Sequence, residues 1–306
     1  MKSTRKAYGE ALVELGKTNK DVIVLDSDLA HATCTILFKE EFPDRHINMG
    51  ISEQDLVGTA VGLALGGKIV YASSFAMFLA GRAYEQIRNS VCYPNIPVRL
   101  CATHSGLSVG EDGATHQCVE DIALMRVLPN MTVFSPSDEW STKNIIKMIE
   151  KISSPVYVRL GRADVENIYS ESDKFEIGGS KTFGEGIAAT VFSTGATLPI
   201  ALEAKDILKA KGIDIRVIDM YSIKPIDKDT ILKAAKETQK LISIEDHSII
   251  GGLGSAVSDI LIEYSPKRLI KIGVEDKFGK SGKASELLDL YGISAENIIS
   301  KILERE

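Results

Sequence analysis

The sequence predicts an α/β protein made of two doubly wound domains, each built on a mostly parallel sheet. Short, continuously apolar runs alternate with longer segments of helical periodicity, which is typical of a parallel sheet covered on both faces. The alternation stops in a polar stretch and then begins again. We therefore expect a first domain over residues 1–165, a linker over 166–181 and a second domain over 182–306.

The first domain is expected to contain five buried strands and several helices. Ser52, followed three residues later by Asp55, is expected to cap the helix over 52–67 through a capping box, and Gly66 to end it. Ser137 is expected to begin the helix over 137–154. The predicted strands are 21–28, 68–74, 98–104, 131–137 and 155–161, and a further helix is predicted over 80–91.

The second domain repeats the alternation in a smaller α/β unit. Its predicted strands are 186–195, 214–222, 240–248 and 269–275, with helices over 196–212, 227–239 and 253–265. The polar segment 166–181 has no sustained period, which is why we expect it to be a linker. No internal repeat or low-complexity tract interrupts either domain.

The composition excludes several classes of protein. The net charge of −6 and the absence of a basic stripe argue against nucleic-acid binding. The apolar runs are too short to cross a bilayer, and the N-terminal segment lacks the apolar stretch of a signal peptide. Four scattered cysteines without a CxxC pair predict reduced thiols and no metal site on cysteine. We therefore expect a cytoplasmic protein.

The loop GLSVGEDGATHQ, residues 106–117, is the strongest candidate for a functional site. It follows a predicted strand, and ligands of open α/β sheets bind at the carboxyl ends of strands. Its glycines are expected to let the backbone approach a ligand closely. His104 lies just before the loop, and His116 lies near its end. The alternative is an exposed surface loop with solvated acids.

Three stretches together resemble the transketolase family. They are ATHSGLSVGEDGATHQ (102–117), NMGISEQDLVGTAVGLAL (48–65) and SSFAMFLAGRAYEQIR (73–88), and TRKAYGEALVEL and VYVRLGR agree with them. The resemblance covers the pyrimidine-binding and C-terminal domains of that family. The GDG motif that holds the diphosphate and metal in transketolases is absent. The resemblance therefore implies the C-terminal subunit of a split transketolase, whose N-terminal partner subunit binds the diphosphate and Mg²⁺ or Ca²⁺.

The resemblance implies thiamin diphosphate as the cofactor and assigns it four residues of this chain. Glu53 matches the carboxylate that activates the cofactor through its aminopyrimidine ring, while Phe75 and Phe78 match aromatic residues that hold this ring. Asp28 matches an acid near the cofactor at the subunit junction. Gly81 stands where a third aromatic residue is usual, with Tyr84 as a candidate substitute. The alternatives are an ordinary acid at the N-terminus of a helix for Glu53, core packing for the two phenylalanines and a turn for Asp28.

The resemblance also implies five substrate-binding residues. His104 and His116 match catalytic histidines that bind the oxygens of the sugar and move protons near neutral pH. Asp112 matches an acid that binds a sugar hydroxyl group. Arg5 and Arg162 match arginines that bind phosphate, because a planar guanidinium holds a phosphate at two points. The alternatives are structural histidines and surface cations. No metal ligand is expected in this chain.

The function implied is the transfer of a two-carbon ketol unit from a ketose phosphate to an aldose phosphate, the chemistry of the pentose phosphate pathway. An assembly with two chains of each kind is expected, with the C-terminal domain contributing to contact between like chains. Three alternatives remain open. They are a deoxyxylulose-phosphate-synthase-like enzyme, a protein like the beta subunit of 2-oxo acid dehydrogenases, and a non-catalytic scaffold that retains the fold.

Overall fold

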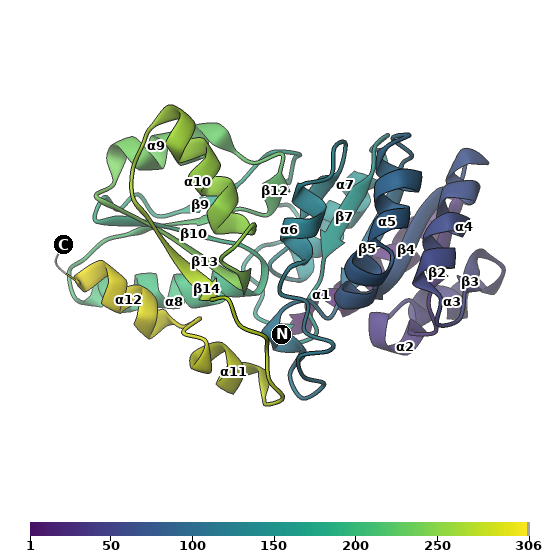
Figure 1. Ribbon diagram of the computed structural model, residues 1–306, viewed down its shortest axis with the longest axis horizontal. Coiled ribbons are helices and arrows are strands. Elements are labelled where there is room, and N and C mark those ends of the chain that lie inside the picture. Colours follow the sequence, from purple (N-terminus) through teal and green to yellow (C-terminus); the bar gives the residue numbers. More distant parts are fainter. Residues whose placement is uncertain (305–306) are drawn as a thin grey trace.

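The computed structural model describes residues 1–304, and it confirms the predicted α/β fold class. Two sheets lie side by side, each with helices on both faces (Figure 1). The first half of the chain forms most of the larger sheet, and the second half forms the smaller sheet. A third, two-stranded sheet pairs β1 (Lys2–Ser3) with β8 (Asp164–Val165), so the start of the chain lies beside the end of the first domain.

The larger sheet has seven strands in the order β12-β6-β7-β5-β4-β2-β3. Six of them are parallel, and β12 is antiparallel to β6. Strand β12 comes from the second half of the chain, so the second domain supplies an edge of the first sheet. The bounds are β2 (Val22–Asp26), β3 (His46–Asn48), β4 (Ile69–Phe75), β5 (Val98–Thr103), β6 (Thr132–Phe134), β7 (Val156–Arg159) and β12 (Ser222–Lys224).

Helices cover both faces of this sheet. One face packs against α1 (Thr4–Thr18), α3 (Ile36–Glu41) and α7 (Glu139–Ile149). The other packs against α4 (Glu53–Leu65), α6 (Asp121–Arg126) and a helix over residues 77–92 in which α5 (Tyr84–Gln86) is flanked by π-helical turns. The short helix α2 (Ala30–Thr33) follows β2. Within residues 1–304, no helix is long and apolar enough to span a membrane.

The predicted caps of two helices are wrong, although α4 does begin directly after Ser52. The Ser52 hydroxyl donates to the carbonyl of Met49 at 2.7 Å, so it makes no cap and no capping box with Asp55. Helix α7 is capped by Asp138 rather than Ser137. The Asp138 carboxylate accepts the backbone N–H of Ser141, whose hydroxyl lies 2.9 Å from the Asp138 nitrogen. In α4 the Ser52 hydroxyl bonds to a nearby carbonyl instead of to an N–H group of the helix. In α7 the carboxylate of Asp138 takes the capping role that we expected of Ser137.

The second sheet has five strands in the order β14-β13-β10-β11-β9, of which only β9 is antiparallel to its neighbour. Helices α8 and α12 cover one face, and α9 and α10 cover the other. The bounds are β9 (Lys181–Phe183), β10 (Ala189–Ser193), β11 (Arg216–Asp219), β13 (Lys240–Ser248), β14 (Leu269–Val274), α8 (Leu198–Ala210), α9 (Lys228–Glu237), α10 (Leu253–Tyr264), α11 (Ala284–Leu290) and α12 (Ala295–Leu303). Helix α11 lies low in Figure 1, toward the first domain.

The segment between β8 and β9 contains no helix or strand, but it is packed rather than loose. Tyr169 and Phe175 are buried within it. The Tyr169 hydroxyl donates to Asp219 of β11 at 2.8 Å, while its backbone N–H donates to Asp138 of the first domain at 2.8 Å. The segment therefore binds to both domains.

A small ion-pair network connects β1, which contains Lys2, to α1 and α7. Lys2 and Lys143 each contact both Glu10 and Glu139, at distances of 2.6–3.0 Å. Burial raises the pKa of Glu139, but hydrogen bonds from Lys2, Lys143 and Asn167 outweigh this and lower the pKa to about 2. Because the ordinary value is 4.5, this carboxylate stabilises the fold above pH 4.5 and loses that effect as the pH falls toward 2.

We expect Glu139→Gln to lower the free energy of unfolding by about 1 kcal/mol at pH 7 and by less at pH 3. Urea unfolding at the two pH values measures the difference. Glu14→Gln is the matched control, because Glu14 forms an exposed ion pair with Lys147 on the same helices. An equal loss at both pH values would contradict the electrostatic origin of the effect.

Candidate active site

Glu53 is the first residue of α4, and its carboxylate is almost completely buried, with a side-chain exposure of 1%. Arg82 Nη1 lies 2.6 Å from one carboxylate oxygen, and the Ser74 hydroxyl donates to the other at 3.3 Å. The Ser27 hydroxyl donates in turn to Ser74 at 2.7 Å. A buried carboxylate requires such partners. Sequence analysis did not identify Arg82.

Four aromatic rings, from Phe75, Phe78, His104 and His116, form a continuous group that we call the ring cluster. Phe75 stacks on His104 with a centroid distance of 3.8 Å and on Phe78 at 5.8 Å. His116 meets Phe78 edge-on at 5.2 Å. The Arg82 guanidinium lies over Phe78, 4.8 Å from the ring centroid. Arg82 therefore connects Glu53 to the ring cluster.

The helix that carries Phe78 departs from α-helical geometry. Residues Met77–Arg82 form a π-helical turn, a distortion that is frequent at functional sites. At Gly81, an added Cβ atom would lie 2.3 Å from the Met77 methyl group. Met77 therefore occupies the space beside Gly81, the position at which the resemblance implies a third aromatic residue. Tyr84 packs against the hydrophobic core of the first domain.

The two histidines differ in their surroundings. His104 is 3% exposed, and its Nδ1 lies 2.9 Å from the Thr103 hydroxyl. Burial, reinforced by the positive charges of Arg5 and Arg162, lowers the pKa of His104 to about 3. At neutral pH this ring is therefore an uncharged hydrogen-bonding group in the chain described. His116 is more open, with Nδ1 3.0 Å from the Thr115 hydroxyl.

Arg5 and Arg162 line one cavity, which also includes Glu111. Arg162 Nη1 donates to the carbonyl of Val109 and lies 3.5 Å from the Asp112 carboxylate and 3.7 Å from that of Glu111. Arg5 Nη1 donates to the carbonyl of Ala32 at 2.8 Å, while its buried Nε has no partner among the described residues. The two arginines and Asp112 are therefore close together.

Asp28 directly follows Ser27, whose hydroxyl donates to Ser74 in the network around Glu53. It is exposed at the end of β2 with a φ of 62°. Its carboxylate accepts a hydrogen bond from the Asn48 amide at 3.0 Å, and its own N–H donates to Asn48 at 3.0 Å. These contacts connect Asp28 to Asn48 rather than to the ring cluster.

The glycines of the loop over 106–117 approach the second domain, whereas we expected them to approach a ligand. An added Cβ atom on Gly106, which has a φ of +74°, would lie 2.3 Å from the Asp246 carboxylate and 2.7 Å from its carbonyl oxygen. One on Gly113 would lie 2.5 Å from the Ser281 hydroxyl. Only glycine fits these contacts without displacement of the neighbouring domain.

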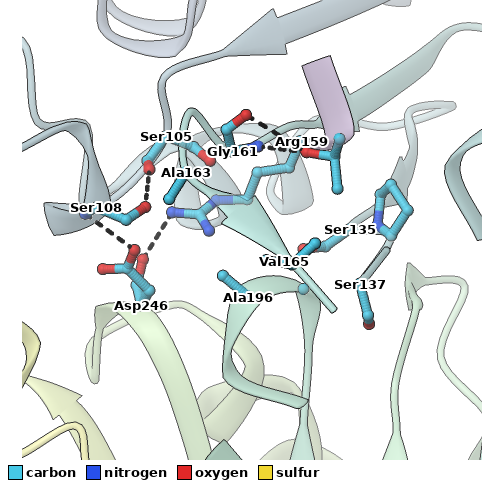
Figure 2. Close-up of a pocket in the computed structure, with 13 residues that line it drawn as sticks. Ser105, Ser108, Ser135, Ser137, Arg159, Gly161, Ala163, Val165, Ala196 and Asp246 are labelled. Atoms are coloured by element: carbon cyan, nitrogen blue, oxygen red, sulfur yellow. Dashed lines mark hydrogen bonds between the residues drawn. The ribbon is translucent and has the colours of Figure 1, made fainter. Parts of the chain in front are cut away.

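Asp246 of β13 holds this loop from the second domain. Its carboxylate accepts the backbone N–H groups of Leu107 at 2.8 Å and Ser108 at 3.3 Å. Its carbonyl accepts a hydrogen bond from Arg159 at 2.7 Å, and Arg159 also pairs with the fully buried Asp121. Figure 2 shows Ser108, Arg159 and Asp246 beside a cavity of about 20 Å³ between the domains, which has room for about one water molecule.

Comparison with known proteins identifies the family. The family model "Transketolase, pyrimidine binding domain" matches residues 1–167, and "Transketolase, C-terminal domain" matches residues 180–298. The chain belongs to the transketolase family. This confirms the resemblance seen in the sequence.

Individual relatives agree with this assignment. A Methanocaldococcus jannaschii protein provisionally named a transketolase C-terminal section is 49% identical, over 99% of this chain and 96% of its own length. The solved structure "Split gene transketolase, inactive beta4 tetramer" has a TM-score of 0.92 and 47% identity, and the match covers 99% of this chain and 97% of that one. Transketolase-like protein 1 of Bos taurus is 40% identical over 97% of this chain, which spans only 50% of that protein.

Two features of this transketolase chain were missed by sequence analysis. Arg82 lies 29 positions from Glu53, and Asp246 lies 139 positions from Leu107, so no local period links either pair. The available signal for Asp246 was the run Glu245-Asp246-His247 within an otherwise apolar strand. Consecutive ionisable residues in a buried strand require partners elsewhere in the fold.

We expect Gly106→Ala to destabilise the protein by about 1–3 kcal/mol more than Gly212→Ala. Both glycines have positive φ values, +74° and +77°, but nothing lies within 4 Å of a Cβ atom added at Gly212. The difference therefore isolates the contact with Asp246. Urea unfolding of the two variants measures it, and equal destabilisation would show that only the backbone conformation matters.

Proposed function

We propose that this chain is the C-terminal subunit of a two-chain, thiamin-diphosphate-dependent transketolase. It would transfer a two-carbon ketol unit from a ketose phosphate to an aldose phosphate. The observation that carries the proposal is the buried Glu53 carboxylate, which Arg82 connects to the ring cluster. The charges of two arginines suited to phosphate, Arg5 and Arg162, act on His104 of that cluster. A carboxylate that accepts a hydrogen bond, next to flat aromatic side chains that stack, suits an aminopyrimidine ring.

The residues fit one end of the cofactor. Glu53 would hold the aminopyrimidine by a hydrogen bond, and the half-exposed Phe78 would pack against the ring. Among residues 1–304, no group of His, Cys, Asp and Glu side chains is arranged to bind a metal ion. The diphosphate and Mg²⁺ or Ca²⁺ would therefore be bound by the N-terminal partner subunit, with Asp28 near the junction. When bound, thiamin diphosphate supplies a thiazolium ring that stabilises a carbanion.

The remaining residues would bind the sugar phosphate. His104, uncharged, would hydrogen-bond a substrate oxygen, and the more open His116 would hold or move a proton there. Asp112 would accept a hydrogen bond from a sugar hydroxyl group. Arg5 and Arg162 would bind the terminal phosphate. This site would hold both sugars with the phosphate end anchored at the arginines.

An assembly with two chains of each kind is part of the proposal. The split-gene relative is described as an inactive beta4 tetramer, which supports the need for a second kind of chain. In the chain alone, the Glu53 carboxylate already has a cationic partner in Arg82. The cofactor ring would have to share or replace that partner.

The test is reconstitution with an N-terminal transketolase subunit, thiamin diphosphate and Mg²⁺, followed by an assay with xylulose 5-phosphate and ribose 5-phosphate. We expect turnover, and we expect Glu53→Gln to lower kcat about 10²–10³-fold, because the amide cannot act as a proton acceptor. Glu203→Gln, at an exposed position of α8, is the control and should match the wild type.

Two outcomes would count against the proposal. Wild-type turnover in Glu53→Gln would remove the role of that carboxylate. Consumption of pyruvate without transfer between sugar phosphates would place the protein with another class of thiamin enzyme.

A further inference from the structure

The cavity that holds Arg5 and Arg162 is formed by both domains. Its volume is about 290 Å³, which is large enough for a phosphate group and part of a sugar. One wall comes from the Gly-rich loop and the segment after β7, and the other from Lys283 and Ala284 just before and at the start of α11. The second domain therefore adds a third cation, Lys283, to the cavity.

The contacts around Gly110 place Lys283 close to Arg162. A Cβ atom added at Gly110 would lie 3.4 Å from the carbonyl oxygen of Gly282, 3.8 Å from the nitrogen of Ala284 and 3.9 Å from Arg162 Nη1. The backbone on both sides of Lys283 thus lies near the Arg162 guanidinium. The Gln117 amide fixes this segment by donating to the carbonyl of Lys280 at 2.9 Å.

The Lys283 ammonium group is only weakly engaged within the chain. Its partner is Glu286, 3.5 Å away, and the two side chains are 75% and 67% exposed. Ion pairs of this kind contribute little stability. Arg162, in contrast, faces the acids Glu111 and Asp112. A dianionic phosphate in the cavity would be repelled by these acids, and an additional cation on the opposite wall offsets that repulsion.

We propose that Lys283 is a specificity-determining residue that binds the terminal phosphate of the sugar together with Arg5 and Arg162. The inference rests on the proposed function and extends it, since the C-terminal domain then takes part in substrate recognition. Lys283 acts as a point charge that favours phosphorylated over unphosphorylated sugars. Its effect falls on binding of the phosphate and not on the chemistry at the carbonyl.

The experiment compares two donors in the reconstituted complex, xylulose 5-phosphate and unphosphorylated erythrulose, with unphosphorylated glyceraldehyde as the acceptor for both. We expect Lys283→Met to lower the ratio of the two kcat/KM values about five- to tenfold, mainly through KM for the phosphorylated donor. Lys283→Arg should keep the ratio near the wild-type value. Lys280→Met is the matched control, because it removes the same charge from the same segment outside this cavity.

An unchanged ratio in Lys283→Met would overturn the inference, and so would an equal loss with both donors, which would indicate a structural role.

If the wild-type complex turns over neither donor, the proposed function has failed, and binding then decides the role of Lys283. Titration of the complex with ribose 5-phosphate, followed by ³¹P NMR, should show about five- to tenfold weaker binding by Lys283→Met. Equal affinity would overturn the inference.

Discussion

The shape of the candidate active site depends on one buried carboxylate, that of Asp246, which accepts two backbone N–H groups of the Gly-rich loop. A loop so rich in glycine has many accessible conformations, and fixing it costs conformational entropy. Charge-assisted hydrogen bonds to a fully buried acceptor offset that cost. Because Asp246 belongs to the second domain, the positions of Asp112 and His116 in the first domain depend on the contact between the domains.

The buried polar groups around Asp246 are held by ion pairing or by hydrogen bonds. Arg159 pairs with Asp121 and also donates to the Asp246 carbonyl. Burial lowers the pKa of the neighbouring His247 to about 4, and its Nε2 accepts the N–H of Ile122 at 3.1 Å. A neutral histidine can accept such a bond and an imidazolium cannot. The interface therefore combines one ion pair, a carboxylate that accepts two backbone N–H groups and an uncharged histidine, so each buried group has a partner.

Sequence patterns predicted the elements whose burial is uniform along the chain. Strands such as β4 and β5 are buried along almost their whole length because helices cover both faces of the sheet. The pattern could not predict β3, which has only three residues, or the cap of α4, where Ser52 turns to a nearby carbonyl. Composition and position singled out the loop, and the resemblance predicted Glu53 and the members of the ring cluster as site residues. Neither could identify the contacts of Arg82 with Glu53 or of Lys283 with the Arg162 cavity, because they join segments that lie far apart in the sequence.

The edge strand β12 has a consequence for any attempt to divide the chain. Residues Ser222–Lys224 lie well beyond the segment 166–181, yet they pair with β6, and Lys224 donates to the carbonyl of Arg126 at 2.9 Å. A fragment that stops within residues 166–181 would lack β12. The N–H and C=O groups of β6 that face β12 would then have no strand to pair with. Unpaired sheet edges recruit strands from other molecules. Such a truncation would therefore favour aggregation, and a soluble minimal version must retain residues 222–224.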